Sequence, residues 1–239
     1  MMSSLNGQVA LITGASGNLG SATAHAFLAE GARLVLVDRS RDRLEELFGN
    51  ASSAEMAMLE AGVDLLDPHA IARVAERAMA RFGRIDVLVN TVGAFRGGPS
   101  FDESDLNDWA AMFDANVRTA VHCCRAVLPY MRQAGHGKII NIGSRAALVG
   151  EAGIGAYSAS KSALLRLTES LAQELKHQGI HVNAVLPGTI DTPQNRQAMP
   201  NADYATWVEP SAIADVIVFL GSNASRGITG ALLPVYGRG

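Results

Sequence analysis

The stretch Tyr157-Ser158-Ala159-Ser160-Lys161 places a phenol and an amine four residues apart. Residues at positions i and i+4 share one face of a helix, so Tyr157 and Lys161 can point into the same site. A free phenol has a pKa of about 10, and a neighbouring ammonium group lowers that value because it favours the phenolate. Tyr157 would then serve as a general acid or base. A buried tyrosine and a surface lysine that share a helix by chance are the alternative.

Two further polar residues could join that pair. Ser144 lies 13 residues before Tyr157 and directly after the apolar run 138–142, and its hydroxyl could hydrogen-bond a carbonyl oxygen undergoing reduction. Asn116 falls at a break between two helical stretches, where it could hold a water that relays protons from Lys161 to solvent. Taken singly, Ser144 is more often a strand-end cap and Asn116 a helix cap.

A glycine-rich loop follows the first apolar run, residues 9–12. Its glycines are spaced G-x-x-G-x-x-G, whereas the usual dinucleotide fingerprint is G-x-G-x-x-G. Glycine permits a turn with positive φ and lets backbone N–H groups approach a phosphate closely. We therefore expect a pyrophosphate cradle, against the alternative of a turn without a ligand. Its residues are Gly14, Ser16, Gly17, Asn18, Leu19 and Gly20. The spacing leaves open whether Gly17 or Asn18 is the position that the pyrophosphate approaches.

An acidic residue, Asp38, ends the second apolar run, 18 residues after Gly20. A carboxylate at this place accepts hydrogen bonds from an adenosine ribose and repels a 2′-phosphate, which favours NAD(H) over NADP(H). Arg39 and Arg41 follow and could hold a phosphate, so NADP(H) stays possible. At the ends of the next two runs, Asp64, Asn90 and the nearby Gly93 could line the adenine and ribose.

Short apolar runs alternate with longer amphipathic stretches along the whole chain. The expected strands are residues 9–13, 33–37, 56–63, 87–90, 138–142, 181–186 and 231–235. The expected helices are residues 18–30, 68–81, 104–116, 119–133 and 157–178. This alternation predicts one α/β domain over residues 1–239, with a doubly wound parallel sheet of about seven strands flanked by helices. In such sheets ligands bind beyond the carboxyl ends of the strands.

The composition narrows the classes of function. The net charge of −3 provides no basic surface for nucleic acid, and no apolar run approaches the ~20 residues of a membrane helix. Two adjacent cysteines form no disulfide framework, and the first residues carry no signal peptide, so we expect a cytoplasmic protein. The six histidines show no metal-ligand spacing, and no metal is expected.

In combination and in this order, these residues resemble the short-chain dehydrogenase/reductase family. The matching segments are TGASGNLG (13–20), Asp38, Asp64, NTVG (90–93), Asn116, Ser144, YSASK (157–161) and PGTIDT (187–192). The resemblance implies a single-domain Rossmann fold that binds NAD(P) and interconverts a small-molecule carbonyl and a secondary alcohol. It also implies a catalytic set of Asn116, Ser144, Tyr157 and Lys161.

The same resemblance implies further contacts and an assembly. Lys161 would contact the nicotinamide ribose, Pro187, Gly188 and Thr192 would lie near the nicotinamide, and the oxidised nicotinamide would help to lower the pKa of Tyr157. A homotetramer or homodimer would form through the helices around residues 119–133 and 157–178.

Two departures and two alternatives accompany this resemblance. The glycine spacing is similar to that of larger, extended members, and Asn-Thr-Val-Gly replaces the usual Asn-Asn-Ala-Gly. Residues 186–207 resemble the corresponding stretch of dihydropteridine reductase, so reduction of a quinonoid pterin is one alternative, although Ser144 suits ordinary carbonyl chemistry better. The other alternative is a binding protein that senses NAD(H) without performing chemistry.

Overall fold

The structure is a computed structural model, and it describes residues 4–238. Its seven strands are β1 (Val9–Thr13), β2 (Arg33–Asp38), β3 (Ala57–Ala61), β4 (Val87–Asn90), β5 (Gly137–Ile142), β6 (Ile180–Pro187) and β7 (Leu232–Val235). They form one parallel sheet in the order β3-β2-β1-β4-β5-β6-β7. The predicted α/β fold with a parallel sheet is therefore confirmed. The third strand is shorter than expected because Gly62 turns the chain with φ = 72°.

Helices connect the strands. They are α1 (Asn18–Ala29), α2 (Arg41–Ser53), α3 (Pro68–Phe82), α4 (Leu106–Phe113), α5 (Thr119–Ala134), α6 (Gly155–Leu175), α7 (Pro193–Ala198) and α8 (Pro210–Gly221). The five expected helices are present as α1, α3, α4, α5 and α6, whereas α2, α7 and α8 are additional. A π-helical turn, Asp114–Arg118, separates α4 from α5 at the expected break.

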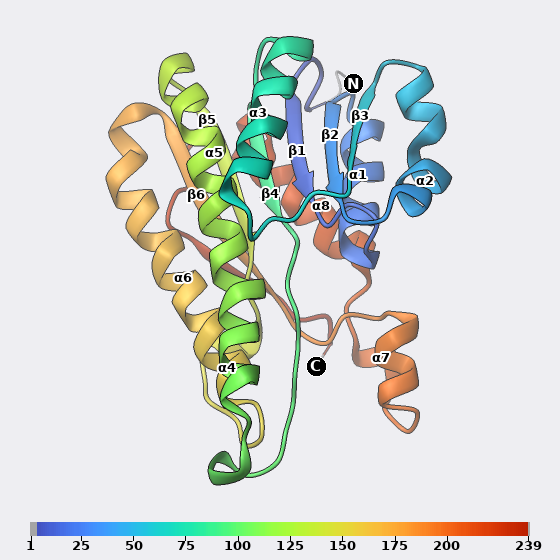
Figure 1. The fold of residues 1–239 in the computed structure, drawn as a ribbon, viewed down its shortest axis with the longest axis vertical. Helices are drawn as coiled ribbons and strands as arrows, with labels where there is room; N and C mark the ends of the chain where they lie inside the picture. Colours follow the sequence, from blue (N-terminus) through green and yellow to red (C-terminus); the bar gives the residue numbers. More distant parts are fainter. Residues whose placement is uncertain (1–3, 239) are drawn as a thin grey trace.

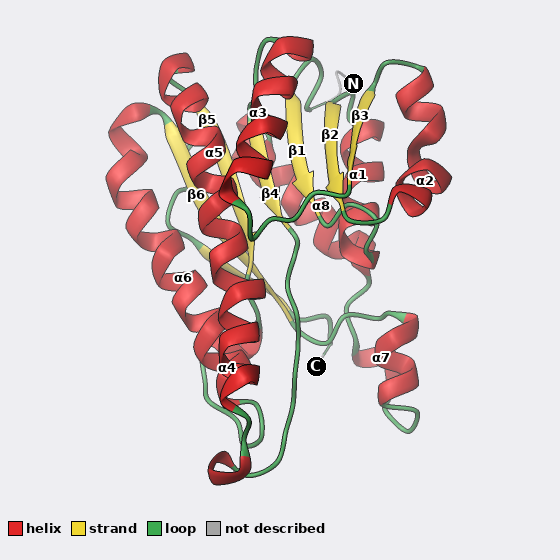
Figure 2. Cartoon of the chain, viewed as in Figure 1, coloured by secondary structure: helices red, strands yellow, loops and turns green. Residues whose placement is uncertain are grey.

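The helices cover both faces of the sheet, as Figures 1 and 2 show, with α3 and α5 in front of the strands and α1 and α8 behind them. Alternate residues of β1 enter two separate cores: Leu11 packs with α3 and α5, while Ile12 packs with α1, α2 and α8. Strands that are buried on both faces need continuous apolar sequences, which explains the runs that predicted them.

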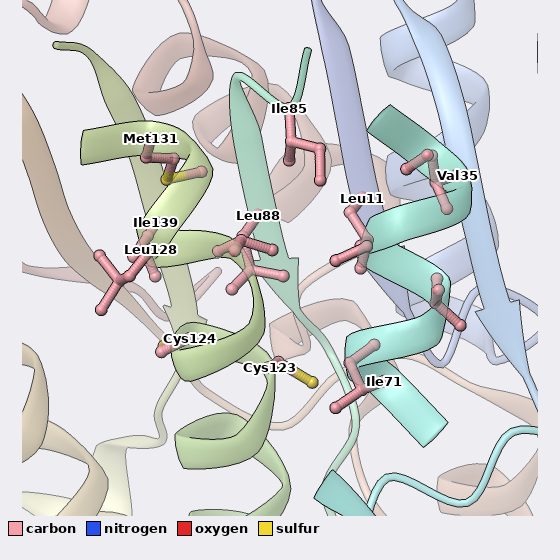
Figure 3. Close-up of a cluster of buried hydrophobic side chains, with 14 of the residues drawn as sticks. Leu11, Val35, Ile71, Ile85, Leu88, Cys123, Cys124, Leu128, Met131 and Ile139 are labelled. Carbon is pink, nitrogen blue, oxygen red and sulfur yellow. The ribbon is translucent and has the colours of Figure 1, made fainter. Parts of the chain in front are cut away.

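The front core contains both cysteines (Figure 3). Burial raises the pKa of Cys124 to about 12 and that of Cys123 well above its ordinary value, so both thiols stay protonated at neutral pH. The two side chains fill space between α5 and the sheet.

Parallel strands send their carboxyl ends to one edge of the sheet, and in Figure 1 the strand arrows point towards the part of the molecule that carries α4 and α7. The strand order reverses beside β1, which has β2 on one side and β4 on the other. Ligands of doubly wound sheets bind at such a switch point, beyond the carboxyl ends. The glycine-rich loop leaves β1 at this position.

The opposite edge of the sheet is held by Asp86, which is 4% exposed. Its Oδ2 accepts hydrogen bonds from the backbone N–H of Val9 (2.8 Å) and from Nε of Arg84 (2.7 Å). Its Oδ1 lies 2.6 Å from Nη2 of Arg84 and 2.8 Å from Nε2 of His136, the residue before β5. One carboxylate therefore joins the starts of β1, β4 and β5.

We expect Asp86→Ala to lower the free energy of unfolding by about 3 kcal/mol, because it leaves the Val9 N–H buried without an acceptor and removes the partner of Arg84. Urea unfolding monitored by circular dichroism measures this loss. Asp215→Ala, at an exposed position of α8, is the control and should change stability by less than about 0.5 kcal/mol. A loss of similar size in both variants would contradict the role of Asp86.

Candidate active site

Helix α6 carries Lys161 into the interior, where the side chain is only 5% exposed. Its Nζ donates a hydrogen bond of 2.7 Å to the carbonyl oxygen of Ile142, at the end of β5. A Cβ atom at position 93 would lie 3.1 Å from this Nζ and 2.9 Å from Oδ1 of Asn116. Gly93 thus lets the chain after β4 pass directly over both polar groups.

Asn116 sits in the π-helical turn, and its amide is fully engaged with the protein. Its Oδ1 accepts from the N–H of Ala94 (2.9 Å), and its Nδ2 donates to the Ala94 carbonyl (3.0 Å) and to Oγ of Ser160 (3.0 Å). The side chain therefore clamps the segment after β4 to α6. The proton relay expected of Asn116 stays a prediction, and the amide has its own partners in the protein.

Ser144 lies in the turn after β5, and its Oγ accepts a hydrogen bond of 3.2 Å from the N–H of Ala146. The Ser144 hydroxyl lowers the pKa of the Tyr157 phenol, but burial raises that pKa more, so the net shift is upward. The expected lowering of the Tyr157 pKa by Lys161 is therefore wrong for the protein chain alone. The reason is desolvation, which disfavours the charged form of both groups. Burial lowers the pKa of Lys161 to about 8.

The edge of the Phe95 ring meets Tyr157, with 5.0 Å between the ring centroids and 77° between the planes. Phe95 is nonetheless 65% exposed, so one side of its ring stays open beside the phenol. The sequence reasoning missed this residue, and its only signal was an aromatic residue two positions after Gly93.

The glycine-rich loop owes its shape to Gly14 and Gly20. Gly14 has φ = 63°, and a Cβ at position 20 would lie 2.0 Å from the Gly14 carbonyl oxygen. Gly17 has an ordinary φ of −74° and precedes the first turn of α1. Asn18 points outward and donates through Nδ2 to Oε1 of Gln194 in α7 (2.8 Å). The fold of the loop thus does not require glycine at position 18, whereas a Cβ at position 17 would lie a tight 3.2 Å from the Gly14 carbonyl oxygen.

A cavity of about 630 Å³ lies between this loop and the ends of the neighbouring strands. Its lining includes Gly14, Ser16, Gly17, Asp38, Arg39, Val63, Leu65, Thr91, Val92, Gly93 and Asp114. The volume falls within the range of small-molecule and cofactor sites. The close backbone approach at Gly14 and Gly20, the start of α1 and a carboxylate at the end of β2 together fit a dinucleotide.

Asp38 joins the loop to the end of β2, because Oδ2 accepts from the N–H of Ser16 (2.9 Å) and Oδ1 from that of Ser40 (3.2 Å). Asp64 lies outside the cavity lining, at its rim. Its carboxylate accepts from the N–H of Leu66 and pairs with Arg39 at 3.1 Å, and these two contacts lower its pKa. Arg39 lines the cavity while it is paired with Asp64.

The structure places the Asn90 side chain differently from expectation. It is 4% exposed, and Nδ2 donates to Oδ1 of Asn141 in β5 (2.9 Å); Asn141 in turn donates to Oγ1 of Thr168 in α6 (2.9 Å). The side chain is thus an interior link and does not line the cavity. The register of β4 against β5 places Asn90 beside Asn141, which explains this orientation. The neighbouring Thr91 lines the cavity instead.

The segment after β6 lies outside the residues that line this cavity. A Cβ at Gly188 would lie 2.9 Å from the carbonyl oxygen of Tyr236, so Gly188 lets the chain pass close to the segment after β7. Thr192 begins α7, and its Oγ1 accepts from the N–H of Asn195 (3.1 Å). The nicotinamide contacts expected of Pro187, Gly188 and Thr192 stay predictions.

This arrangement has recognisable relatives. A family model described as short chain dehydrogenase matches residues 8–203. The chain belongs to the short-chain dehydrogenase family.

Curated relatives align over nearly the whole of this short-chain dehydrogenase. A 3-oxoacyl-(acyl-carrier-protein) reductase of Thermotoga maritima is 32% identical over 241 residues, with 98% of each chain covered. The D-threitol dehydrogenase of Mycolicibacterium smegmatis is 34% identical, with 98% of this chain and 93% of the relative covered. A cis-4-hydroxycyclohexanecarboxylate dehydrogenase of Sinomonas cyclohexanicum is 32% identical, with 96% and 95% covered. The protein is thus an oxidoreductase that acts on CH–OH groups with NAD(P) as acceptor.

The described part of this short-chain dehydrogenase also bears on metal sites and membrane helices. Between residues 4 and 238, no three or more His, Cys, Asp or Glu side chains gather in a way that could hold a metal ion. In the same part of the chain, no helix combines the length and apolar character needed to cross a membrane. The expected resemblance of residues 186–207 to dihydropteridine reductase stays a prediction.

We expect Lys161→Met to make the protein more stable at pH 7, because it removes a buried charge. The folded pKa of about 8 lies below the unfolded value, so the unfolded state binds more protons between pH 8 and about 10.4, and wild-type stability rises with pH across that window. Below pH 8 the full loss of stability from burying the charged Lys161 amine, about 3 kcal/mol, is present. Loss of the bond to Ile142 offsets about 1 kcal/mol of the gain.

Urea unfolding of both proteins from pH 7 to 10 measures this difference. The gain of Lys161→Met over the wild type should shrink as the pH rises. Lys176→Met, at an exposed position after α6, should show neither the gain nor its pH dependence. A Lys161→Met protein that is less stable than the wild type at pH 7 would contradict the burial argument.

Proposed function

We propose that this protein is an NAD(H)-dependent oxidoreductase that interconverts a carbonyl group and a secondary alcohol, with Tyr157 as acid and base. The observations that carry the proposal are at the carboxyl edge of the sheet. The Ser144 hydroxyl acts on the Tyr157 phenol, and the buried amine of Lys161 lies directly under Gly93, which lines the cavity of about 630 Å³. When bound, the nicotinamide supplies the hydride to the carbonyl carbon or takes it from the alcohol.

The protein residues position the substrate and handle the proton. Ser144 donates a hydrogen bond to the carbonyl oxygen, and its hydroxyl is close enough to Tyr157 to lower the pKa of the phenol. The Tyr157 phenol, whose pKa is raised by burial, is protonated at neutral pH, so its proton is available to the oxygen as the carbonyl is reduced. Lys161, with a pKa of about 8, is mostly charged at pH 7, and its charge would offset part of the desolvation penalty of the phenolate that this transfer leaves.

Asn116 supports this set through the clamp on Ala94 and Ser160. Ser160 lies one residue before Lys161, so the clamp fixes the first turns of α6. A sensor without chemistry has no use for a buried lysine that costs stability, and the complete Ser–Tyr–Lys set favours the enzyme over that alternative. The same set, with Ser144 present, favours ordinary carbonyls over a quinonoid pterin.

For the cofactor we propose NAD(H) over NADP(H). Asp38 faces the cavity, where its negative charge would lie close to a 2′-phosphate. Arg39, which could otherwise neutralise that phosphate, is paired with Asp64. We also propose a homodimer or homotetramer through α5 and α6, in a cytoplasmic setting.

Tyr157→Phe should reduce kcat for ketone reduction by at least ~10³-fold, since it removes the proton donor while keeping the ring packed against Phe95. The dissociation constant for NADH, measured by fluorescence titration, should change by less than about threefold. NADH oxidation with a panel of ketones, quinones and quinonoid dihydropterin provides the activity measurement. Unchanged turnover in Tyr157→Phe would overturn the assignment of Tyr157 as the proton donor. If the wild type binds NADH but turns over no compound of the panel, the sensor without chemistry is favoured.

The wild type should bind NADH at least ~10-fold more tightly than NADPH, a difference of about 1.4 kcal/mol. Asp38→Asn keeps an oxygen that can accept a hydrogen bond from the N–H of Ser16 but removes the negative charge. It should therefore bring the dissociation constants for NADH and NADPH to within about threefold of each other. Asp42→Asn, in the exposed first turn of α2, is the control and should leave the ratio unchanged. A wild-type preference for NADPH would refute the role of Asp38.

A further inference from the structure

A second, smaller pocket of about 230 Å³ lies beside Tyr157, and we name it the aromatic pocket. One wall is the segment after β4 with the start of α4, and the other is the loop that leads into α6. The lining residues are Arg96, Gly97, Gly98, Pro99, Phe101, Ser104, Asp108, Trp109, Glu151, Ala152, Gly153, Ile154, Gly155 and Ala156. Figure 1 shows the first wall as the long green segment that descends from β4 and returns as α4.

The aromatic pocket borders the reacting site through Phe95. A Cβ at Gly97 would lie 3.6 Å from Cζ of Phe95 and 3.7 Å from Cγ2 of Ile154, so the tip of the Phe95 ring reaches the pocket wall. The same ring contacts Tyr157. On the other wall, Ala156 directly precedes Tyr157. Phe95 therefore lies between Tyr157 and the wall of this pocket.

Several polar groups of the pocket lining already have partners within it. Arg96 pairs with Asp108, Nε1 of Trp109 donates to Ser104, and Ser104 donates to the Phe101 carbonyl (2.7 Å). The two walls are joined by a hydrogen bond of 2.8 Å from the Gly98 N–H to the Gly153 carbonyl. A hydroxylated substituent would lose its bonds to water here without gaining these partners.

What remains for a ligand is apolar surface. The rings of Phe101 and Trp109 meet edge to face, with centroids 6.1 Å apart, and Ile154 contributes an aliphatic side. The charged group left in the lining is Glu151, an exposed carboxylate that would repel an anionic substituent. An apolar cavity of about 150 Å³ binds benzene, so about 230 Å³ suits a six-membered carbon ring with room to spare.

We propose that the substrate is a ketone, or the matching secondary alcohol, with one uncharged cyclic hydrocarbon substituent, and that the aromatic pocket binds that ring. The inference rests on the proposed carbonyl chemistry at Tyr157. Phe95 separates the ring from the reacting carbon and contacts both parts of the substrate. The ring packs against Trp109 and Ile154, and the smaller substituent stays outside the pocket.

Gly155→Val tests the pocket by filling it. Gly155 lacks a positive φ, and a Cβ there would lie 3.6 Å from Cζ2 of Trp109, an ordinary contact, so valine extends into the pocket from the first turn of α6. Gly150→Val is the matched control, because a Cβ at position 150 meets no atom within 4 Å and Gly150 is outside the lining.

The kinetic comparison uses two methyl ketones, cyclohexyl methyl ketone and 2-butanone, with NADH. The wild type should show kcat/KM at least ~10-fold higher for the cyclohexyl ketone. Gly155→Val should bring the ratio of the two kcat/KM values close to one, and Gly150→Val should leave that ratio unchanged. The proposal would be overturned if the wild type had similar kcat/KM values for the two ketones, or if Gly155→Val kept the wild-type preference for the cyclohexyl ketone.

A binding measurement separates this inference from the proposed function. In a Trp207→Phe background Trp109 is the remaining tryptophan, and cyclohexanol should change its fluorescence saturably. Gly155→Val should weaken that binding at least ~10-fold, and Gly150→Val should not. If no ketone is reduced, the proposed function fails, and this titration then decides the pocket: saturable binding weakened by Gly155→Val supports it, and its absence overturns it.

Discussion

The burial of one cation, Lys161, is the constraint around which the site is organised. A charged amine inside a protein needs a partner at short range, and the carbonyl oxygen of Ile142 provides it. That requirement fixes the distance between α6 and the end of β5, and with it the distance between Tyr157 and Ser144. It also leaves no space for a side chain at position 93, where the chain crosses above the amine.

Polar links inside the sheet hold that arrangement in register. The chain of side-chain hydrogen bonds from Asn90 through Asn141 to Thr168 runs from β4 through β5 to α6. Apolar packing alone permits small sliding of a helix on a sheet, whereas a buried hydrogen bond has a narrow range of distance and angle. The three residues therefore set where α6 stops along the strands, and the position of Tyr157 follows from that.

Sequence patterns predicted the strands because each is an unbroken apolar run. They indicated Tyr157, Lys161 and Ser144 as candidate site residues, because helical spacing places two side chains on one face and strand ends lie at one edge of the sheet. The sequence pattern did not predict helix α2, because this helix buries only Leu44 and Phe48. It did not predict helix α8, because the apolar run of α8 has no regular polar face. The interior position of Asn90 depends on its register with Asn141, which sequence spacing does not contain. The sign of the Tyr157 pKa shift depends on burial, and the aromatic pocket depends on two loops that are distant in sequence.

The glycine-rich loop changes what should be sought in other chains of this kind. A Cβ at position 20 would collide with the Gly14 carbonyl, and Gly14 needs its left-handed backbone. Of the positions between them, a Cβ at 17 would lie a tight 3.2 Å from the same carbonyl oxygen, whereas position 18 accepts a side chain. Here one of them holds Asn18, whose side chain reaches Gln194, 176 residues away. Gly14 and Gly20 are therefore the glycines that this turn requires most strictly, and Gly17 is favoured by a tighter contact than usual. A pattern that insists on glycine at the position of Asn18 would pass over proteins that use this position to fasten the loop to a distant helix.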